Sequence, residues 1–301
     1  MNDEAADSFL SKPPKTRFML WLVFSAVCLT AALVLPKVRP SASTEADAEP
    51  PPLQYVQPGS LNSRVLGERR HFTVYLPKSY AAVQQHYPVL FLLDGPRHGG
   101  YATALAAYLA GYSETIPPII IVDIAQQHRG RDMTPTPARD HPHDTGGADR
   151  FLAFLAQELV PHIQSHYRTK SPRVLWGHSL SGLFVFHALL TEPELFDGYI
   201  TASPSLWWDD SLLVRRADDF FKSRQTLDGK LFFGVGADER QAVQDYFNQM
   251  NRIFDAHTPK GFQVSMRRFE GEGHGTICIP TTYNGLKFIF GATGTNAAQL
   301  R

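Results

Sequence analysis

The chain has 301 residues, of which 43% are hydrophobic, so it is long enough to bury one large core. Its 29 basic and 29 acidic residues give a formal net charge of zero, which excludes a global electrostatic field that would recruit nucleic acid or a membrane surface. The chain holds only two cysteines, Cys28 and Cys278, which excludes a disulfide framework within a domain.

The N-terminal region predicts membrane targeting. Residues 1–17 are polar and end in a basic stretch, and the 18 residues of Phe18–Leu35 carry no charge. Such a run is just long enough to span a bilayer and longer than the core of a cleaved signal peptide. We expect an uncleaved signal anchor, with a signal peptide as the alternative, and residues 1–17 in the cytoplasm. We expect a Pro/Ala/Ser-rich linker at residues 36–59. Residues 60–301 are expected to form a folded domain in the periplasm, tethered to the inner membrane.

Within that domain, short apolar runs alternate with amphipathic segments. The first strands are expected at Arg64–Leu66 and Arg70–Leu76, as a hairpin at the sheet edge. Further strands are expected at Tyr87–Leu93, Ile119–Ala125, Val174–Trp176, Gly198–Ala202, Lys230–Val235 and Gln263–Phe269. Helices are expected at Ala102–Ala110, Ala148–Tyr167, Leu183–Leu190, Ser211–Arg224, Arg240–Ala256 and Thr281–Phe290, and a long loop at Gln126–Gly146. This alternation predicts an α/β fold, with a mostly parallel central sheet and helices on both faces.

The segment Arg173–Phe186 predicts a strand, a tight turn and a helix, with Ser179 at the apex of the turn. Its centre, G-H-S-L-S-G, has the layout of a G-x-S-x-G nucleophile elbow, although Ser181 stands where the fifth residue is usually glycine. Such a turn exposes the serine hydroxyl. It also directs the backbone N–H of Leu180 at the oxyanion that forms on attack.

Ligands bind outside the carboxyl ends of the strands in sheets of this kind, so the residues after each strand are the candidates for the rest of the site. The glycine-rich stretch after Leu93 would hold a second oxyanion donor. Pro96 has no N–H, so the donor is Gly95, Arg97 or a rearranged neighbour.

His274 lies between two glycines after the last predicted strand, where its ring can reach a cleft and accept the serine proton. An acid on the preceding strand end completes the order of serine, acid and histidine that α/β-hydrolases share. We expect this acid to be Glu239. Asp238 and a Ser–His dyad without an acid are the alternatives.

Several further motifs carry a family resemblance. They are L-L-D-G at Leu92–Gly95, R-G-R-D-M-T-P at Arg129–Pro135, W-G-H-S-L-S-G-L-F at Trp176–Phe184, S-P-S-L-W-W at Ser203–Trp208 and G-H-G at Gly273–Gly275. Together they resemble the esterase family of the α/β-hydrolases, which includes enterochelin (catecholate siderophore) esterases and S-formylglutathione hydrolases. The resemblance covers roughly residues 60–291. It implies an α/β-hydrolase fold with Ser179 as nucleophile and His274 as base.

The resemblance also implies a periplasmic carboxylic ester hydrolase that cuts the trilactone ester bonds of a ferric catecholate siderophore such as enterobactin and thereby aids iron release. Ferric tris-catecholate is a flat-sided aromatic trianion, so its pocket needs cations and stacking surfaces. We expect Arg97, Arg129, Arg131 and Trp207 to bind it. Asp132 is expected to anchor its loop.

No cofactor is expected, because attack by serine needs no metal. The side chains His128, Asp140, His141, His143 and Asp144 lie close in sequence, but their spacing fits no strong zinc pattern. Two other functions remain open. One is an exported esterase or acyltransferase on other acyl esters, similar to S-formylglutathione hydrolases or acting on envelope esters, and the other is a non-catalytic siderophore-binding module.

Overall fold

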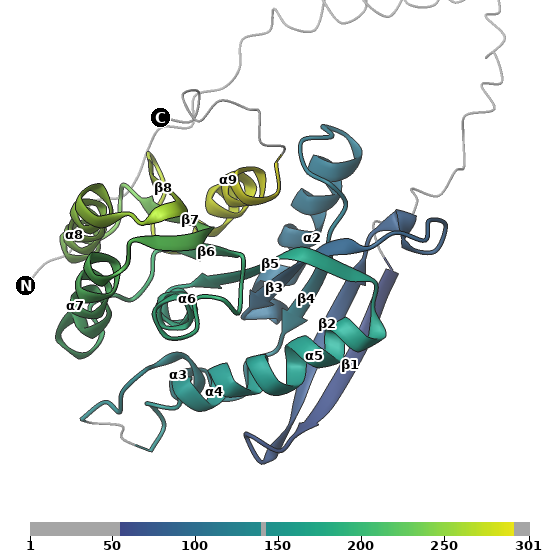
Figure 1. The fold of residues 1–301 in the computed structure, drawn as a ribbon, viewed down its shortest axis with the longest axis horizontal. Coiled ribbons are helices and arrows are strands. Elements are labelled where there is room, and N and C mark those ends of the chain that lie inside the picture. Colours follow the sequence, from purple (N-terminus) through teal and green to yellow (C-terminus); the bar gives the residue numbers. More distant parts are fainter. Residues whose placement is uncertain (1–54, 140–142, 292–301) are drawn as a thin grey trace, which may run out of the picture. The chain divides into compact units, whose positions relative to one another are not determined.

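A computed structural model describes residues 55–139 and 143–291, which form an α/β fold around one eight-stranded sheet (Figure 1). The strands lie in the order β1-β2-β4-β3-β5-β6-β7-β8. Strands β3 to β8 are parallel to one another, whereas β2 is antiparallel to both β1 and β4. The bounds are β1 Tyr55–Ser63, β2 Glu68–Leu76, β3 Tyr87–Leu93, β4 Ile120–Ile124, β5 Thr169–His178, β6 Gly198–Ala202, β7 Thr226–Gly236 and β8 Lys260–Phe269.

Helices cover both faces of this sheet (Figure 1). Helices α2 (Gly95–Gly111) and α9 (Cys278–Phe290) pack on one face. The other face carries α4 (Ala148–Phe154), α5 (Val160–His166), α6 (Leu180–Thr191), α7 (Trp208–Ser223) and α8 (Gln241–His257). A π-helical turn, Leu155–Leu159, joins α4 to α5, and the short helix α3 (Arg129–Met133) and a 3-10 turn at Lys78–Tyr80 complete the set in the described ranges. The α/β-hydrolase fold expected from the sequence is confirmed.

The central strands are apolar because both of their faces are covered. Every residue of β3 is buried, and so are Val174, Leu175 and Trp176 of β5. Trp176 packs in the cluster under α2 and α9, whereas Leu175 packs in the cluster under α4 to α8. Because successive side chains alternate between faces, these two layers hold β5 from both sides.

The N-terminal hairpin differs from the prediction. The first strand is Tyr55–Ser63, and the expected strand Arg64–Leu66 lies in the turn that joins β1 to β2. Tyr55–Gly59, assigned to the linker, thus belongs to the sheet. The strand was hidden because β1 is an edge strand with an exposed first half and a proline, Pro58, which a sheet tolerates at an edge.

Two further elements were misplaced. Helix α2 begins at Gly95 and not at the predicted Ala102. The prediction missed the first turns because they hold three glycines and Pro96, which lower the apparent helix propensity. The predicted loop Gln126–Gly146 contains the short helix α3.

The predicted anchor Phe18–Leu35 and the linker up to residue 54 lie outside the described residues. Within residues 55–139 and 143–291, no helix has the length and apolarity that crossing a membrane requires.

Candidate active site

Ser179 lies in the turn between β5 and α6 with φ 60° and ψ −117°, a conformation that non-glycine residues rarely adopt. The turn closes because its neighbours are small. A Cβ at Gly177 would lie 2.2 Å from the Ser181 carbonyl oxygen, and one at Gly182 would lie 2.7 Å from Thr201 Oγ1. The sequence therefore builds the tight strand-to-helix turn that holds the Ser179 hydroxyl at the carboxyl edge of the sheet.

The Ser179 hydroxyl meets the imidazole of His274, with 3.1 Å between Oγ and Nε2. On the other side of the ring, Nδ1 lies 2.8 Å from Glu239 Oε2. The carboxylate can only accept, so Nδ1 carries the proton and Nε2 has the lone pair that receives the proton of the serine. The structure thus brings Ser179, His274 and Glu239 together, and of the two candidate acids Glu239 is the one that His274 contacts.

The Glu239 carboxylate is enclosed, with a side chain only 2% exposed, whereas the His274 side chain is 50% exposed. Burial by itself would raise the pKa of Glu239, but hydrogen bonds from His274 and Ser203 outweigh it and hold the pKa below its ordinary value. The N–H of Gly236 also donates to Oε1, at 3.3 Å. The acid therefore stays ionised and oriented toward His274.

Leu180 and Gly95, the two expected oxyanion donors, are the first residues of α6 and α2. The N–H groups in the first turn of a helix have no partner inside the helix, so both are available to a ligand. The Arg97 N–H instead donates to the Asp94 carbonyl oxygen at 3.0 Å. Among the alternatives that the sequence left open, Gly95 is thus the one with a free donor.

A second network ties the nucleophile turn to the start of α2. The Ser181 hydroxyl donates to Asp94 Oδ2 at 2.7 Å, and Arg129 Nε lies 2.9 Å from both Asp94 carboxylate oxygens. Arg129 also donates to the His178 carbonyl oxygen at 3.1 Å. Arg129, expected to bind substrate, therefore holds two catalytic loops together.

A cavity of about 660 Å³ adjoins the triad through His178 and Gly275, the chain neighbours of Ser179 and His274. Of the expected substrate contacts, Arg97 lines this cavity and is exposed. Arg131 does not line it. Its guanidinium instead pairs with the carboxylates of Glu68 and of the fully buried Asp132.

Trp207 is 46% exposed at the start of α7. It follows Ser205 by two residues, and the Ser205 hydroxyl lies 3.3 Å from Ser179 Oγ. Asp132 anchors its loop as expected, since it pairs with Arg70 as well as Arg131.

Sequence reasoning missed the roles of Ser203, Ser205 and His178. Ser203 donates to the Glu239 carboxylate, and His178 donates from Nε2 to the carbonyl oxygen of His274 at 2.8 Å. All three residues lie at the end of β5 or within three residues of the end of β6, and these strands pair side by side. The S-P-S run after a strand end, on the edge where Ser179 lies, was the signal that could have found the two serines.

Comparisons with known proteins identify the family of the chain. The family model described as "Putative esterase" matches residues 63–273. Ferri-bacillibactin esterase BesA of Bacillus subtilis is 27% identical over 257 residues, which cover 77% of this chain and 89% of BesA. The apo-salmochelin esterase of Escherichia coli is 28% identical over 225 residues, 68% of each chain. The crystal structure of an IroE-like serine hydrolase from Shewanella oneidensis is 31% identical with a TM-score of 0.71, covering 78% of this chain and 80% of that one.

Proposed function

Because this chain belongs to the esterase family and is a carboxylic ester hydrolase, we propose that its substrate is a catecholate siderophore, whose ester bonds it hydrolyses to aid iron release. The observation that carries this proposal is the Ser179–His274–Glu239 triad beside a cavity lined by Arg97. Relatives whose names specify siderophore esters, those of ferri-bacillibactin and apo-salmochelin, support the choice of substrate.

The geometry accounts for ester cleavage in two steps. Ser179 Oγ attacks the ester carbonyl carbon while His274 Nε2 takes its proton, and the N–H groups of Leu180 and Gly95 receive the charge that develops on the carbonyl oxygen. His274 then gives the proton to the leaving alkoxide, which departs as an alcohol. Water, deprotonated by His274, releases the acid from the acyl-serine and restores the hydroxyl of Ser179.

The surroundings of the triad suit an anionic aromatic ligand. Arg97 supplies a cation at the cavity, and the half-exposed Trp207 supplies a stacking surface near Ser205. A cavity of about 660 Å³ falls within the range of small-molecule sites. Arg129 contributes indirectly, since its ion pair with Asp94 positions the loop that carries Gly95.

The proposal includes the location of the enzyme. The uncharged run Phe18–Leu35 after a basic stretch favours an inner-membrane anchor, with the esterase domain in the periplasm. We expect the full-length chain to remain in the membrane fraction. We also expect protease added outside the inner membrane to digest the domain. Release of a shortened soluble chain would identify a cleaved signal peptide instead.

The decisive experiment incubates the purified chain with apo and ferric enterobactin and with p-nitrophenyl acetate, and follows linear trimer, dimer and monomer products by chromatography. We expect rapid trilactone cleavage that is lost in Ser179→Ala. Hydrolysis of the small ester alone would keep the serine mechanism and reject the siderophore. Binding without turnover in the wild-type chain would indicate a non-catalytic module.

A further inference from the structure

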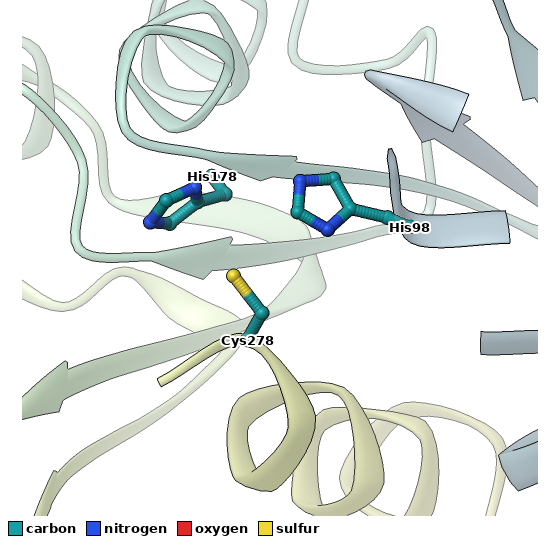
Figure 2. Close-up of side chains that lie close together, drawn as sticks. All are labelled: His98, His178 and Cys278. Carbon is teal, nitrogen blue, oxygen red and sulfur yellow. The ribbon is translucent and has the colours of Figure 1, made fainter. Parts of the chain in front are cut away.

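Three metal-ligating side chains that the mechanism does not use lie close together (Figure 2). His98 comes from the first turn of α2, His178 from the last residue of β5 and Cys278 from the first residue of α9. All three are buried, with 4%, 6% and 4% exposure. One nitrogen of each ring and the Cys278 Sγ lie within 4.8 Å of one another.

Each histidine has a free nitrogen. His178 Nε2 must carry the ring proton, since its partner is the carbonyl oxygen of His274 at 2.8 Å, and this leaves a lone pair on Nδ1. That Nδ1 is buried without a hydrogen-bond partner, and so is His98 Nε2. Neutral imidazoles with unpaired lone pairs are the form in which histidine binds metals.

The outer contacts have the arrangement seen around metal-bound histidines. Such a histidine usually donates its second ring N–H to a carbonyl oxygen or another oxygen acceptor, which fixes the tautomer and the ring orientation. His178 does this toward the His274 carbonyl oxygen. The other nitrogen of His98, Nδ1, lies 3.0 Å from the Tyr101 hydroxyl. Both rings are therefore already held in place.

We propose that His98, His178 and Cys278 form a binding site for one zinc ion. Two imidazoles and a thiolate are a donor set that Zn²⁺ favours, and three protein ligands leave a fourth position for water. Zinc bond lengths place the ligand atoms of a tetrahedral site about 3.3–3.6 Å apart, so the cluster must contract by roughly 1 Å. Rotation of the short Cys278 side chain supplies part of this movement.

The cavity of about 660 Å³ gives the ion a route, because all three residues line it. On binding, the Cys278 thiol releases its proton to solvent and Sγ bonds to the metal, so the ion with its three ligands carries one net positive charge. No oxidant or reductant is needed. The site does not depend on the substrate proposed above, and zinc has no part in the attack by Ser179.

The test uses the purified full-length chain, freed of metal with a chelator, and Co²⁺ as a coloured substitute for Zn²⁺. A thiolate bound to Co²⁺ gives a charge-transfer band in the near ultraviolet, which imidazole and carboxylate ligands do not give. We expect this band to saturate at one Co²⁺ per chain and to disappear when Zn²⁺ is added. A rise in Tm with Zn²⁺ concentration is expected too, since an ion that binds only the folded state stabilises it.

Matched variants locate the site. Cys278→Ser must lose the band, while Cys28→Ser, which removes the other thiol of the chain, must keep it. His98→Gln is expected to weaken Co²⁺ binding at least tenfold. His166→Gln removes the exposed member of the pair His162 and His166 on α5, whose rings lie 4.1 Å apart, and must leave the band unchanged. Absence of the band in the wild-type chain, or its persistence in Cys278→Ser, would overturn the proposal.

Discussion

The Ser181 hydroxyl donates a hydrogen bond of 2.7 Å to the Asp94 carboxylate, and so joins the nucleophile turn to the loop that opens α2. The fifth position of the G-x-S-x-G pattern, where glycine is usual, thus carries a side chain with a structural partner. Ser181 is fully buried, so no water replaces its hydroxyl if it is removed.

Ser181→Ala should lower the free energy of unfolding by about 1–3 kcal/mol, because it leaves Asp94 with one donor fewer in a buried site. A decrease in kcat should accompany it, since the two loops carry Ser179 and Gly95. Urea unfolding and ester turnover measure the two effects. The control is Ser165→Ala on the exposed surface of α5, which should change stability by less than about 0.5 kcal/mol. Equal effects of the two variants would contradict the role of Ser181.

Glu239→Gln should reduce kcat by about 10³–10⁴ while the fold is retained. The amide keeps the shape of the carboxylate, but it no longer stabilises the imidazolium of His274 and can favour the wrong tautomer. Asp238→Asn is the matched control, because Asp238 is adjacent and exposed. Steady-state kinetics on a small aryl ester compare them. Greater loss in the Asp238 variant would mean that the acid has been misassigned.

Gly95→Ala should be strongly destabilising, because a Cβ at this position would lie 1.2 Å from Asp123 Oδ1. Relief requires movement of a buried carboxylate, and overpacking of this kind costs about 1–3 kcal/mol. Turnover should fall as well, because Gly95 is one of the two oxyanion donors proposed above. Gly100→Ala in the same helix meets nothing within 4 Å, and it should be neutral or stabilise by up to about 1 kcal/mol. The difference in Tm between the two variants tests the close approach.

Asp123 makes stability depend on pH. It is 5% exposed, and burial raises the pKa of its carboxyl to about 6, above the unfolded value of about 3.9. The folded chain therefore holds this proton more tightly. The resulting stabilisation is complete below the unfolded pKa and is lost as the pH rises through 6.

Asp123→Asn should remove this loss, so that the change in unfolding free energy between pH 5 and pH 8 is about 1 kcal/mol smaller than in wild type. Chemical denaturation at the two pH values measures it. Asp219→Asn, on the exposed surface of α7, should leave the wild-type pH dependence in place. A pH dependence unaltered in Asp123→Asn would show that the carboxyl titrates in its ordinary range.

Arg97→Gln should raise KM for the ferric siderophore by about 10-fold or more, because a charge-assisted contact is worth about 1.5–3 kcal/mol. Turnover of p-nitrophenyl acetate, which is uncharged, should change little. Arg252→Gln serves as the control, since Arg252 is exposed on α8 and lines a different cavity. A parallel loss on both substrates would assign Arg97 to the fold and not to recognition.

The sequence predicted those parts of the fold whose residues repeat a strong local pattern. Strands Tyr87–Leu93 and Gly198–Ala202 agree with the prediction to the residue, because strands buried on both faces are continuous apolar runs. Edge strand β1 lacked this signal, since half of it is exposed, and the first turns of α2 were hidden by glycines that Asp123 requires.

The candidate site divides in the same way. The order of Ser179, Glu239 and His274 along the chain was sufficient to propose the triad, because motif and strand position are local. The role of Arg129 could not be predicted in this way, since its partner Asp94 lies 35 residues earlier and no periodicity connects the two residues. Chemical type alone placed Arg129 and Arg131 together at the substrate, whereas their carboxylate partners are set by the tertiary fold.

At position 179, the stability of the fold and the catalytic chemistry favour different residues. Glycine is the residue that the backbone prefers at φ 60° and ψ −117°, and serine is the residue that the chemistry requires. A library of variants ranked only by thermal stability would therefore favour glycine at 179 and discard the enzyme. Any effort to stabilise this protein has to measure turnover alongside melting temperature. In the nucleophile turn, a substitution that raises the melting temperature is expected to lower the activity.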